Sequence, residues 1–190
     1  MVKNIVIVGG GSAGWMTASL MSKQLNGVNI SLIESPDVPV VGVGESTVPP
    51  IVEFMKSLDL EEKDWMPACN AVYKSSICFQ GFHDKNDPPF WYPFNRTWSA
   101  ANRPANRYWL YKHLTDEKFS DRFSLYDYCS LVPEICRQGK TVRSFPNAGY
   151  AYHFDAALLG EYLKEYSIKR GVQYISDTIK NVVQNEDGSI

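Results

Sequence analysis

The sequence predicts an α/β fold that begins with a Rossmann-like βαβ unit. Ile5 to Val8 is an unbroken apolar run, typical of a strand buried on both faces in a parallel sheet. Glycines interrupt this run at Gly9 to Gly14, and apolar residues then recur with helical spacing until Asn26-Gly27. A second strand is predicted from Val28 to Glu34. Strand, glycine turn, helix and strand thus follow one another over the length of a βαβ unit.

Length and composition restrict the classes of partner. The chain has 190 residues, enough for one domain with a substantial core. Its 19 basic and 21 acidic side chains give a net charge of −2 without a long run of either sign, so we expect no nucleic-acid partner. No segment has the ~18 apolar residues of a membrane span, and the first apolar run is too short for a signal-peptide core. We therefore expect a cytoplasmic protein with no membrane partner.

The cysteines and histidines predict no metal site. They are dispersed along the chain: Cys69, Cys78, Cys129, Cys136, His83, His113 and His153. No two cysteines have C-x-x-C spacing, so neither a zinc site nor a disulfide framework is indicated. We expect the four thiols to be buried or half-buried.

The middle of the chain combines regular elements with an irregular aromatic-rich insertion. A helix is predicted from Ile51 to Leu58, opened by Pro50, and a strand over residues 75 to 82. Residues 83 to 104 are rich in Pro, Asn and aromatic side chains. Because aromatic side chains are costly to expose, we expect this segment to pack against the fold or line a pocket.

The last part of the chain returns to regular structure. The predicted elements are helices from Asn106 to Leu114 and from Asp155 to Arg170, and strands from Val172 to Ser176 and from Ile179 to Val183. Asp155 fits the N-cap of its helix and Gly171 its end. Asn185 to Gly188 reads as a hairpin turn, whose returning strand would need residues beyond Ile190. We therefore expect the N-terminal part of a longer protein; a polar tail that frays is the alternative.

Gly9 to Gly14 match the dinucleotide-binding fingerprint G-x-G-x-x-G. Gly9 would make the tight turn, Gly11 would let the backbone approach a pyrophosphate, and Gly14 would let the helix pack on the sheet. Ser12 and Ala13 lie between these glycines, where the start of the helix offers N–H groups to phosphates. The fingerprint therefore predicts a site for a dinucleotide.

Glu34 supplies the acid that usually accompanies this fingerprint. It lies about 20 residues after Gly14, at the end of the second predicted strand. A carboxylate there accepts hydrogen bonds from both ribose hydroxyls and repels a 2′-phosphate, which disfavours NADP. FAD and NAD remain open at this point, as does an ordinary glycine turn with an incidental glutamate.

A second polar motif lies at Gly44-Glu45-Ser46-Thr47-Val48-Pro49. Its residues suit a loop that presents N–H and hydroxyl groups. The alternative is a capped helix start, with Ser46 or Thr47 as the N-cap of the next helix.

Together with Gly9 to Trp15, this loop resembles the flavin-dependent tryptophan halogenase family. Tyr152-His153-Phe154-Asp155, followed by Leu158-Leu159 and Arg170-Gly171-Val172, is similar to a helix-entry segment of that family. The resemblance covers essentially all 190 residues. It implies a fold of the flavoprotein monooxygenase type with FAD as cofactor.

The resemblance also implies a division of the chain and further FAD contacts. Residues 1 to 50 would form the dinucleotide-binding unit and flavin loop, residues 70 to 150 the start of a substrate-pocket insertion, and residues 151 to 190 the return to the FAD-binding domain. The flavin ring would lie by Gly44, Glu45, Ser46 and Thr47. The backbone of Ile179 would contact the adenine.

Family membership would imply a halogenation reaction in which Lys74 is the catalytic residue. Reduced FAD, provided by a separate flavin reductase, O₂ and halide would give a hypohalous acid that a lysine holds or activates for attack by an aromatic substrate. From the residues themselves, Lys74 lies among apolar neighbours in Val72-Tyr73-Lys74 and Ile77, surroundings that lower the pKa of an ammonium group. A solvated lysine at a strand edge is the alternative.

The resemblance places the substrate beside Tyr92-Pro93-Phe94, where the family commonly has His-Pro-Phe. The histidine is absent, so tryptophan, another indole, a phenol or a pyrrole all remain as substrates. The halide-binding residues and a tryptophan-rich motif are expected beyond residue 190, so the 190 residues alone are expected to be inactive. A homodimer is left open.

Two other functions remain alternatives. One is a flavin-dependent monooxygenase or hydroxylase, and the other is a non-catalytic, truncated flavin-binding fragment. An NAD-dependent dehydrogenase is disfavoured, because no catalytic histidine constellation is visible.

Overall fold

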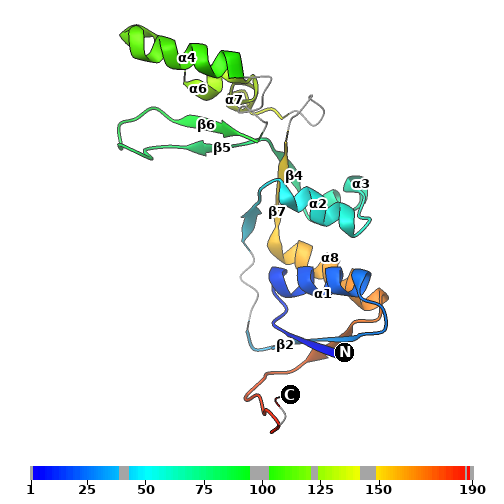
Figure 1. The fold of residues 1–190 in the computed structure, drawn as a ribbon. Coiled ribbons are helices and arrows are strands. Elements are labelled where there is room, and N and C mark those ends of the chain that lie inside the picture. The colour runs from blue at the N-terminus through cyan, green and yellow to red at the C-terminus, as the bar shows by residue number, and fades with distance from the viewer. Residues whose placement is uncertain are drawn as a thin grey trace. The chain divides into compact units, whose positions relative to one another are not determined.

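The computed structural model describes residues 2–38, 43–94, 103–120, 124–141, 149–186 and 188 (Figure 1). The chain folds into two compact units. Unit 1 consists of residues 1–46, 54–71 and 154–190, and unit 2 of residues 47–53 and 72–153. Unit 2 is therefore built almost entirely from one long segment inserted between parts of unit 1.

Unit 1 is an α/β unit around a parallel sheet of order β1-β2-β8. Its elements are β1 (Asn4–Val8), α1 (Ser12–Gln24), β2 (Asn29–Glu34), β3 (Gly44–Ser46), α3 (Glu62–Ala68), α8 (Ala156–Lys169) and β8 (Gln173–Ser176). The predicted βαβ unit is confirmed: Ile7 of β1 pairs with Leu32 of β2, which pairs in turn with Tyr174 of β8. β8 enters this sheet from the far end of the sequence.

Helices α1 and α8 pack against each other on one side of the sheet (Figure 1). Leu32 on that face is fully buried, as are Trp15 and Ala18 of α1. Between the two helices, the hydroxyls of Ser19 and Ser167 lie 3.0 Å apart. Small side chains at this crossing let the helix backbones come close together, which secures α8 over the βαβ unit.

The other face of β1 departs from the sequence prediction. Val6 is 58% exposed and Val8 is 64% exposed, so the prediction of a strand buried on both faces is wrong for the described chain. Side chains alternate between the two faces of a strand. Within the described part of unit 1, α1 and α8 cover only the face that carries Ile5 and Ile7.

The stretch after β8 also differs from expectation. Residues Ile179 to Val183 form no strand, and Val182 and Val183 are 55% and 72% exposed. A strand is held by hydrogen bonds to a neighbour, and this stretch pairs with none of the described strands. The turn that follows is confirmed, with the N–H of Gly188 donating to the carbonyl of Asn185 at 2.9 Å.

Within the residues that the structure describes, unit 2 contains two antiparallel strand pairs and four complete helices. The pairs are β4 (Val72–Lys74) with β7 (Ala151–Asp155), and β5 (Ser76–Phe79) with β6 (Phe90–Pro93). The helices are α4 (Arg103–Thr115), α5 (Glu117–Ser120), α6 (Leu125–Cys129) and α7 (Val132–Arg137). Helix α2 (Pro50–Ser57) and strand β7 each include residues of both units.

The insertion is partly regular, unlike the prediction. Residues 75 to 82 do not form one strand: β5 begins after Ser75 and ends at Phe79, shortly before Gly81 with its φ of +58°. β6 lies inside the segment expected to be irregular, and its Phe90 stacks on Phe79 at 5.1 Å. The aromatic side chains there pack as expected, while residues 95 to 102 lie outside the described residues.

The predicted helices are confirmed and the cysteine prediction is partly wrong. Ile51 to Leu58, Asn106 to Leu114 and Asp155 to Arg170 correspond to α2, α4 and α8. The four cysteines are free; Cys69 is buried, Cys129 and Cys136 are half-buried, and Cys78 is exposed. Cys78 is exposed because it lies on the open side of the two-stranded β5–β6 ribbon.

Asp155 is the N-cap of α8, as its position in the sequence predicts. Its Oδ1 accepts hydrogen bonds from the N–H groups of Ala157 at 2.9 Å and Leu158 at 3.1 Å. Asp155→Ala is expected to lower the free energy of unfolding by about 1 kcal/mol, because two N–H groups lose their acceptor. Thermal unfolding of Asp155→Ala and Asp155→Asn tests this. An equal loss in Asp155→Asn, which keeps an acceptor oxygen, would contradict the hydrogen-bond explanation.

Candidate functional site

The glycine turn joins β1 to α1 with the geometry that the fingerprint predicts. Gly9 has a φ of +106°, a conformation that other residues rarely adopt, and its N–H donates to the carbonyl of Ile33 at 2.9 Å. Gly11 is the extended N-cap residue and α1 begins at Ser12. The first N–H groups of α1 have no partner within the helix, and they give this end a positive partial charge.

The glycines have different steric roles. A Cβ at Gly14 would lie 1.9 Å from the carbonyl oxygen of Gly9, so the helix could not start so close to the turn. A Cβ at Gly11 would meet no atom within 4 Å. The side of the turn at Gly11 is therefore open, and the missing side chain leaves room for a ligand to approach the backbone. These observations fit a bound pyrophosphate.

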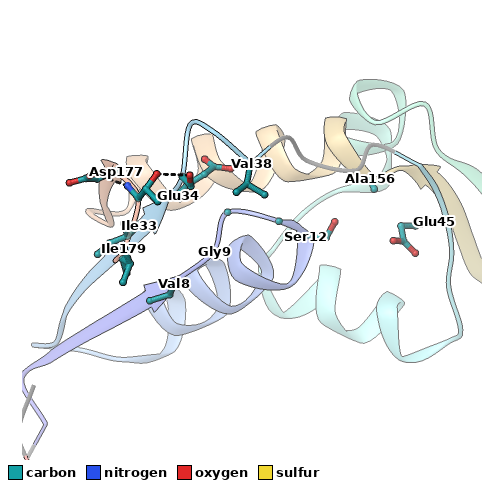
Figure 2. Close-up of a pocket in the computed structure, with 14 residues that line it drawn as sticks. Val8, Gly9, Ser12, Ile33, Glu34, Val38, Glu45, Ala156, Asp177 and Ile179 are labelled. Atoms are coloured by element: carbon teal, nitrogen blue, oxygen red, sulfur yellow. Dashed lines mark hydrogen bonds between the residues drawn. The ribbon is translucent and has the colours of Figure 1, made fainter. Parts of the chain in front are cut away.

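A pocket of about 490 Å³ opens beside the glycine turn (Figure 2). Six of the predicted cofactor residues line it: Gly9, Gly11, Ser12, Glu34, Glu45 and Ile179. The other predicted cofactor residues are not among its lining residues: Ala13, Gly14, Gly44, Ser46 and Thr47. The pocket therefore brings together the fingerprint, its acid, one residue of the polar motif and the residue expected near the adenine.

Sequence reasoning missed the residues that follow β8. Asp177, labelled near Glu34 in Figure 2, and Thr178 line the pocket. The hydroxyls of Thr178 and Ser35 lie 2.7 Å apart. The N–H of Asp177 donates to the carbonyl of Glu34 at 3.0 Å. Ligands of open parallel sheets bind at the carboxyl ends of the strands. The position of β8 beside β2 would have identified these residues, but this pairing is not visible in the sequence.

The polar motif is a short strand rather than a loop at its start. Gly44–Ser46 forms β3, and Thr47 follows it. The Thr47 hydroxyl donates to the carbonyl of Tyr152 at 2.7 Å and accepts from the N–H of Tyr152 at 3.1 Å. The alternative of Thr47 as a helix cap is therefore not supported, because its hydroxyl bonds to β7 instead.

Lys74 is held by two groups in unit 2. Its Nζ donates to the backbone carbonyl of Thr47 at 2.8 Å and lies 5.4 Å from the ring centroid of Phe94. The residue is only 8% exposed, so the alternative of a solvated lysine is wrong. Burial lowers the pKa of the Lys74 ammonium group, as the sequence predicts. The neighbours differ from those expected, since Val72 points to solvent and is 57% exposed.

The positive charge of Lys74 also acts on a second basic side chain, that of His153. His153 lies on β7, where it pairs in register with Val72 of β4. Burial and the positive charge of Lys74 both lower the pKa of His153. Both effects favour the neutral form of His153.

The three predicted substrate residues have different surroundings. Phe94 lies beside Lys74, and its N–H donates to the carbonyl of Ser75 at 3.0 Å. Pro93 is buried at the end of β6. Tyr92 is 41% exposed and packs edge-on against Tyr126, with ring centroids 5.1 Å apart. Lys74 thus links Thr47 of the predicted flavin loop to Phe94 of the predicted substrate residues.

The described residues form neither a metal site nor a membrane span. Within the residues that the structure describes, no group of three or more His, Cys, Asp or Glu side chains could hold a metal ion. None of the described helices is long and apolar enough to cross a bilayer.

Sequence comparisons match this chain to known proteins over its whole length. A family model described as tryptophan halogenase matches residues 4–190. The tryptophan 6-halogenase SttH of Streptomyces toxytricini is 38% identical over 207 residues, covering 98% of this chain and 39% of SttH. The tryptophan 7-halogenase RebH of Lentzea aerocolonigenes is 32% identical and is covered to 38%. The chain therefore spans about two fifths of the length of these relatives.

Solved structures give the same result. Xcc4156, a flavin-dependent halogenase from Xanthomonas campestris, superimposes with a TM-score of 0.84 at 34% sequence identity. The match covers 100% of this chain and 38% of Xcc4156. The fold described above is therefore shared with the corresponding part of that structure.

Proposed function

Because the chain belongs to the tryptophan halogenase family, we propose that it provides the FAD-binding part of an enzyme that halogenates an electron-rich aromatic compound. The observation that carries this proposal is the position of Lys74. Its ammonium group is buried between the Thr47 carbonyl and the Phe94 ring. Because the amine is buried, little water competes with an oxidant for its N–H groups.

The unit 1 pocket supports FAD as the cofactor. Gly9, Gly11 and Ser12 would receive the pyrophosphate, Glu34 the ribose, and Ile179 the adenine. Reduced flavin, supplied by a separate flavin reductase, would provide the reactivity toward O₂ that produces hypohalous acid from halide. The predicted contacts of Gly44, Glu45, Ser46 and Thr47 with the flavin ring are part of the same proposal.

Lys74 would hold the oxidant through its own N–H groups. As an ammonium it donates a hydrogen bond to hypohalous acid. As a free amine it can take the halogen: the N–halogen bond forms as the O–halogen bond breaks, and the hydroxide leaves with an amine proton as water. Burial favours the free amine relative to an exposed lysine. The Thr47 carbonyl accepts one N–H and so fixes the direction of the others.

The substrate class follows from the relatives and from Phe94. SttH and RebH are named for tryptophan. We propose tryptophan or another indole, phenol or pyrrole compound that stacks near Phe94, with Tyr92 and Pro93 shaping the pocket wall. Tyr92 is half-exposed and stands where the family commonly has histidine. Through this residue the substrate preference of this chain would differ from that of its relatives.

The mass of the product tests the proposal. The full-length protein, supplied with flavin reductase, NADH, FAD, O₂ and bromide, is expected to convert tryptophan or a simpler indole or phenol to a brominated product with the paired isotope pattern of bromine. Omitting bromide should remove that product. A product that gains only oxygen would favour a flavin monooxygenase instead. FAD binding without turnover of any aromatic compound would favour a non-catalytic flavoprotein.

A further inference from the structure

We propose that Lys164 is a positioning residue for Glu34 and that it prepares the carboxylate for the ribose hydroxyls of a dinucleotide. The inference rests on the proposed binding of FAD in the unit 1 pocket. It concerns a residue of α8, more than a hundred positions from the fingerprint, which hydrogen-bonds Glu34 across a sequence separation of 130.

The two carboxylate oxygens of Glu34 have different neighbours. Oε2 accepts from the Lys164 Nζ at 3.5 Å. Oε1 lies over the glycine turn, where a Cβ at Gly10 would be only 2.1 Å away. The Lys164 and Glu34 side chains are 20% and 17% exposed. Lys164 therefore holds one oxygen while the other is kept over the turn that lines the pocket.

Aromatic side chains fix Lys164 itself. Its Nζ lies 4.1 Å from the ring centroid of Tyr174 and 5.8 Å from that of Trp15, and these two rings are 5.9 Å apart. Cations are attracted to the faces of aromatic rings at such distances. Glu161 lies 3.9 Å from the Nζ, and its side chain is 72% exposed. Trp15, which follows the fingerprint directly, therefore helps to hold the lysine.

The charge on Lys164 is secured in this environment. Burial lowers the pKa of its ammonium group, but Glu161, Tyr174 and Glu34 outweigh this effect and the pKa is raised. The group is therefore protonated at physiological pH. A side chain at Gly10 would displace the Glu34 carboxylate from its position over the turn.

A carboxylate that is already in position raises the affinity of the site for its ligand, because the side chain need not rearrange when the ligand binds. Without Lys164, Glu34 would lose the partner of Oε2 and could turn toward water. We therefore expect Lys164 to determine how strongly the site distinguishes a ribose from a 2′-deoxyribose. A purely structural ion pair between α8 and the sheet would stabilise the fold without altering that discrimination.

The test uses the full-length protein and two probes that compete with FAD. FAD affinity is measured by the change in flavin fluorescence, and ADP and 2′-deoxy-ADP are then used to displace it. The wild type is expected to prefer ADP by about tenfold, the value of one hydrogen bond to a charged group. Lys164→Met should remove most of this preference. Lys164→Arg, which keeps the positive charge, should retain it. Lys169→Met, which changes a lysine of the same helix that is 76% exposed, should leave it unchanged.

The double variant Glu34→Gln/Lys164→Met tests whether Lys164 acts through Glu34 or independently of it. Glu34→Gln should lose the preference for ADP, and adding Lys164→Met to it should cause no further loss, because Lys164 acts through Glu34. Independent losses, or an undiminished preference in Lys164→Met, would overturn the positioning role. If Lys164→Met fails to fold, Lys164→Gln decides by the same comparison. A wild type that does not bind FAD would overturn the proposed function instead.

Discussion

Lys74→Ala in the full-length protein is expected to lower the rate of halogenation by at least about a hundredfold, which is the usual cost of removing a group that transfers or holds a proton in the reaction. FAD should still bind, because Lys74 is not among the residues that line the unit 1 pocket. Product formation and FAD affinity are measured on the same preparation. The physical reason is that alanine leaves the oxidant without the buried N–H groups.

Two further variants sharpen this experiment. Lys74→Met keeps much of the side-chain volume and should lose activity to the same extent as Lys74→Ala. Lys85→Ala changes an exposed lysine of unit 2 and should behave as the wild type. Full activity in Lys74→Met would remove Lys74 from the mechanism. Loss of both activity and FAD binding would instead assign it a structural role.

Gly14→Ala is expected to lower the free energy of unfolding by about 3 kcal/mol, at the upper end of the range for overpacking. The new methyl group would lie 1.9 Å from the carbonyl oxygen of Gly9, and neither backbone can retreat without separating α1 from the sheet. Thermal unfolding of the full-length protein measures the loss. FAD binding should fall together with stability.

Gly11→Ala provides the matched control. Gly11 has a φ of −70° and an open space where its Cβ would lie, so alanine fits without strain. We expect an unchanged unfolding temperature but weaker FAD binding, because the methyl group occupies the approach of the pyrophosphate. If Gly11→Ala bound FAD as tightly as the wild type, the pyrophosphate could not lie at this turn. If Gly14→Ala kept its full stability, the close contact with Gly9 would be relieved more easily than the geometry suggests.

Local patterns predicted much of the fold. The glycine turn, helix α1 and the Asp155 cap each depend on residues close together in sequence, and the structure confirms all three as structural elements. The exposure of Val6 and Val8 in β1 was not predicted. An apolar run indicates that a strand lies in a sheet, but whether each face is covered depends on elements elsewhere in the chain. The short helices α5, α6 and α7 have 4, 5 and 6 residues, too few for a periodic pattern to be recognised.

The candidate site could be predicted only in part, because some of its contacts join neighbouring positions and others join distant ones. Gly9, Gly11 and Glu34 follow from one compact motif and line one pocket. The surroundings of Lys74 could not be predicted, because Thr47 and Phe94 reach it through strand pairings rather than through neighbouring positions. Lys164 was missed altogether, since a lysine on an amphipathic helix is ordinarily exposed. Only the tertiary contact with Glu34 distinguishes it.

The pairing of β2 with β8 sets the order in which this molecule can assemble during synthesis. Ser31 and Gln173 share a hydrogen bond although they are 142 positions apart, and α1 is covered by α8, which emerges just before β8. During synthesis the βαβ segment emerges first, and Trp15 of α1 cannot be covered by α8 until the whole of unit 2 has left the ribosome. Contacts between such distant positions form slowly, because the intervening loop must first be closed. The dinucleotide pocket can therefore be completed only after Asp177 and Thr178 have been made, long after the fingerprint itself.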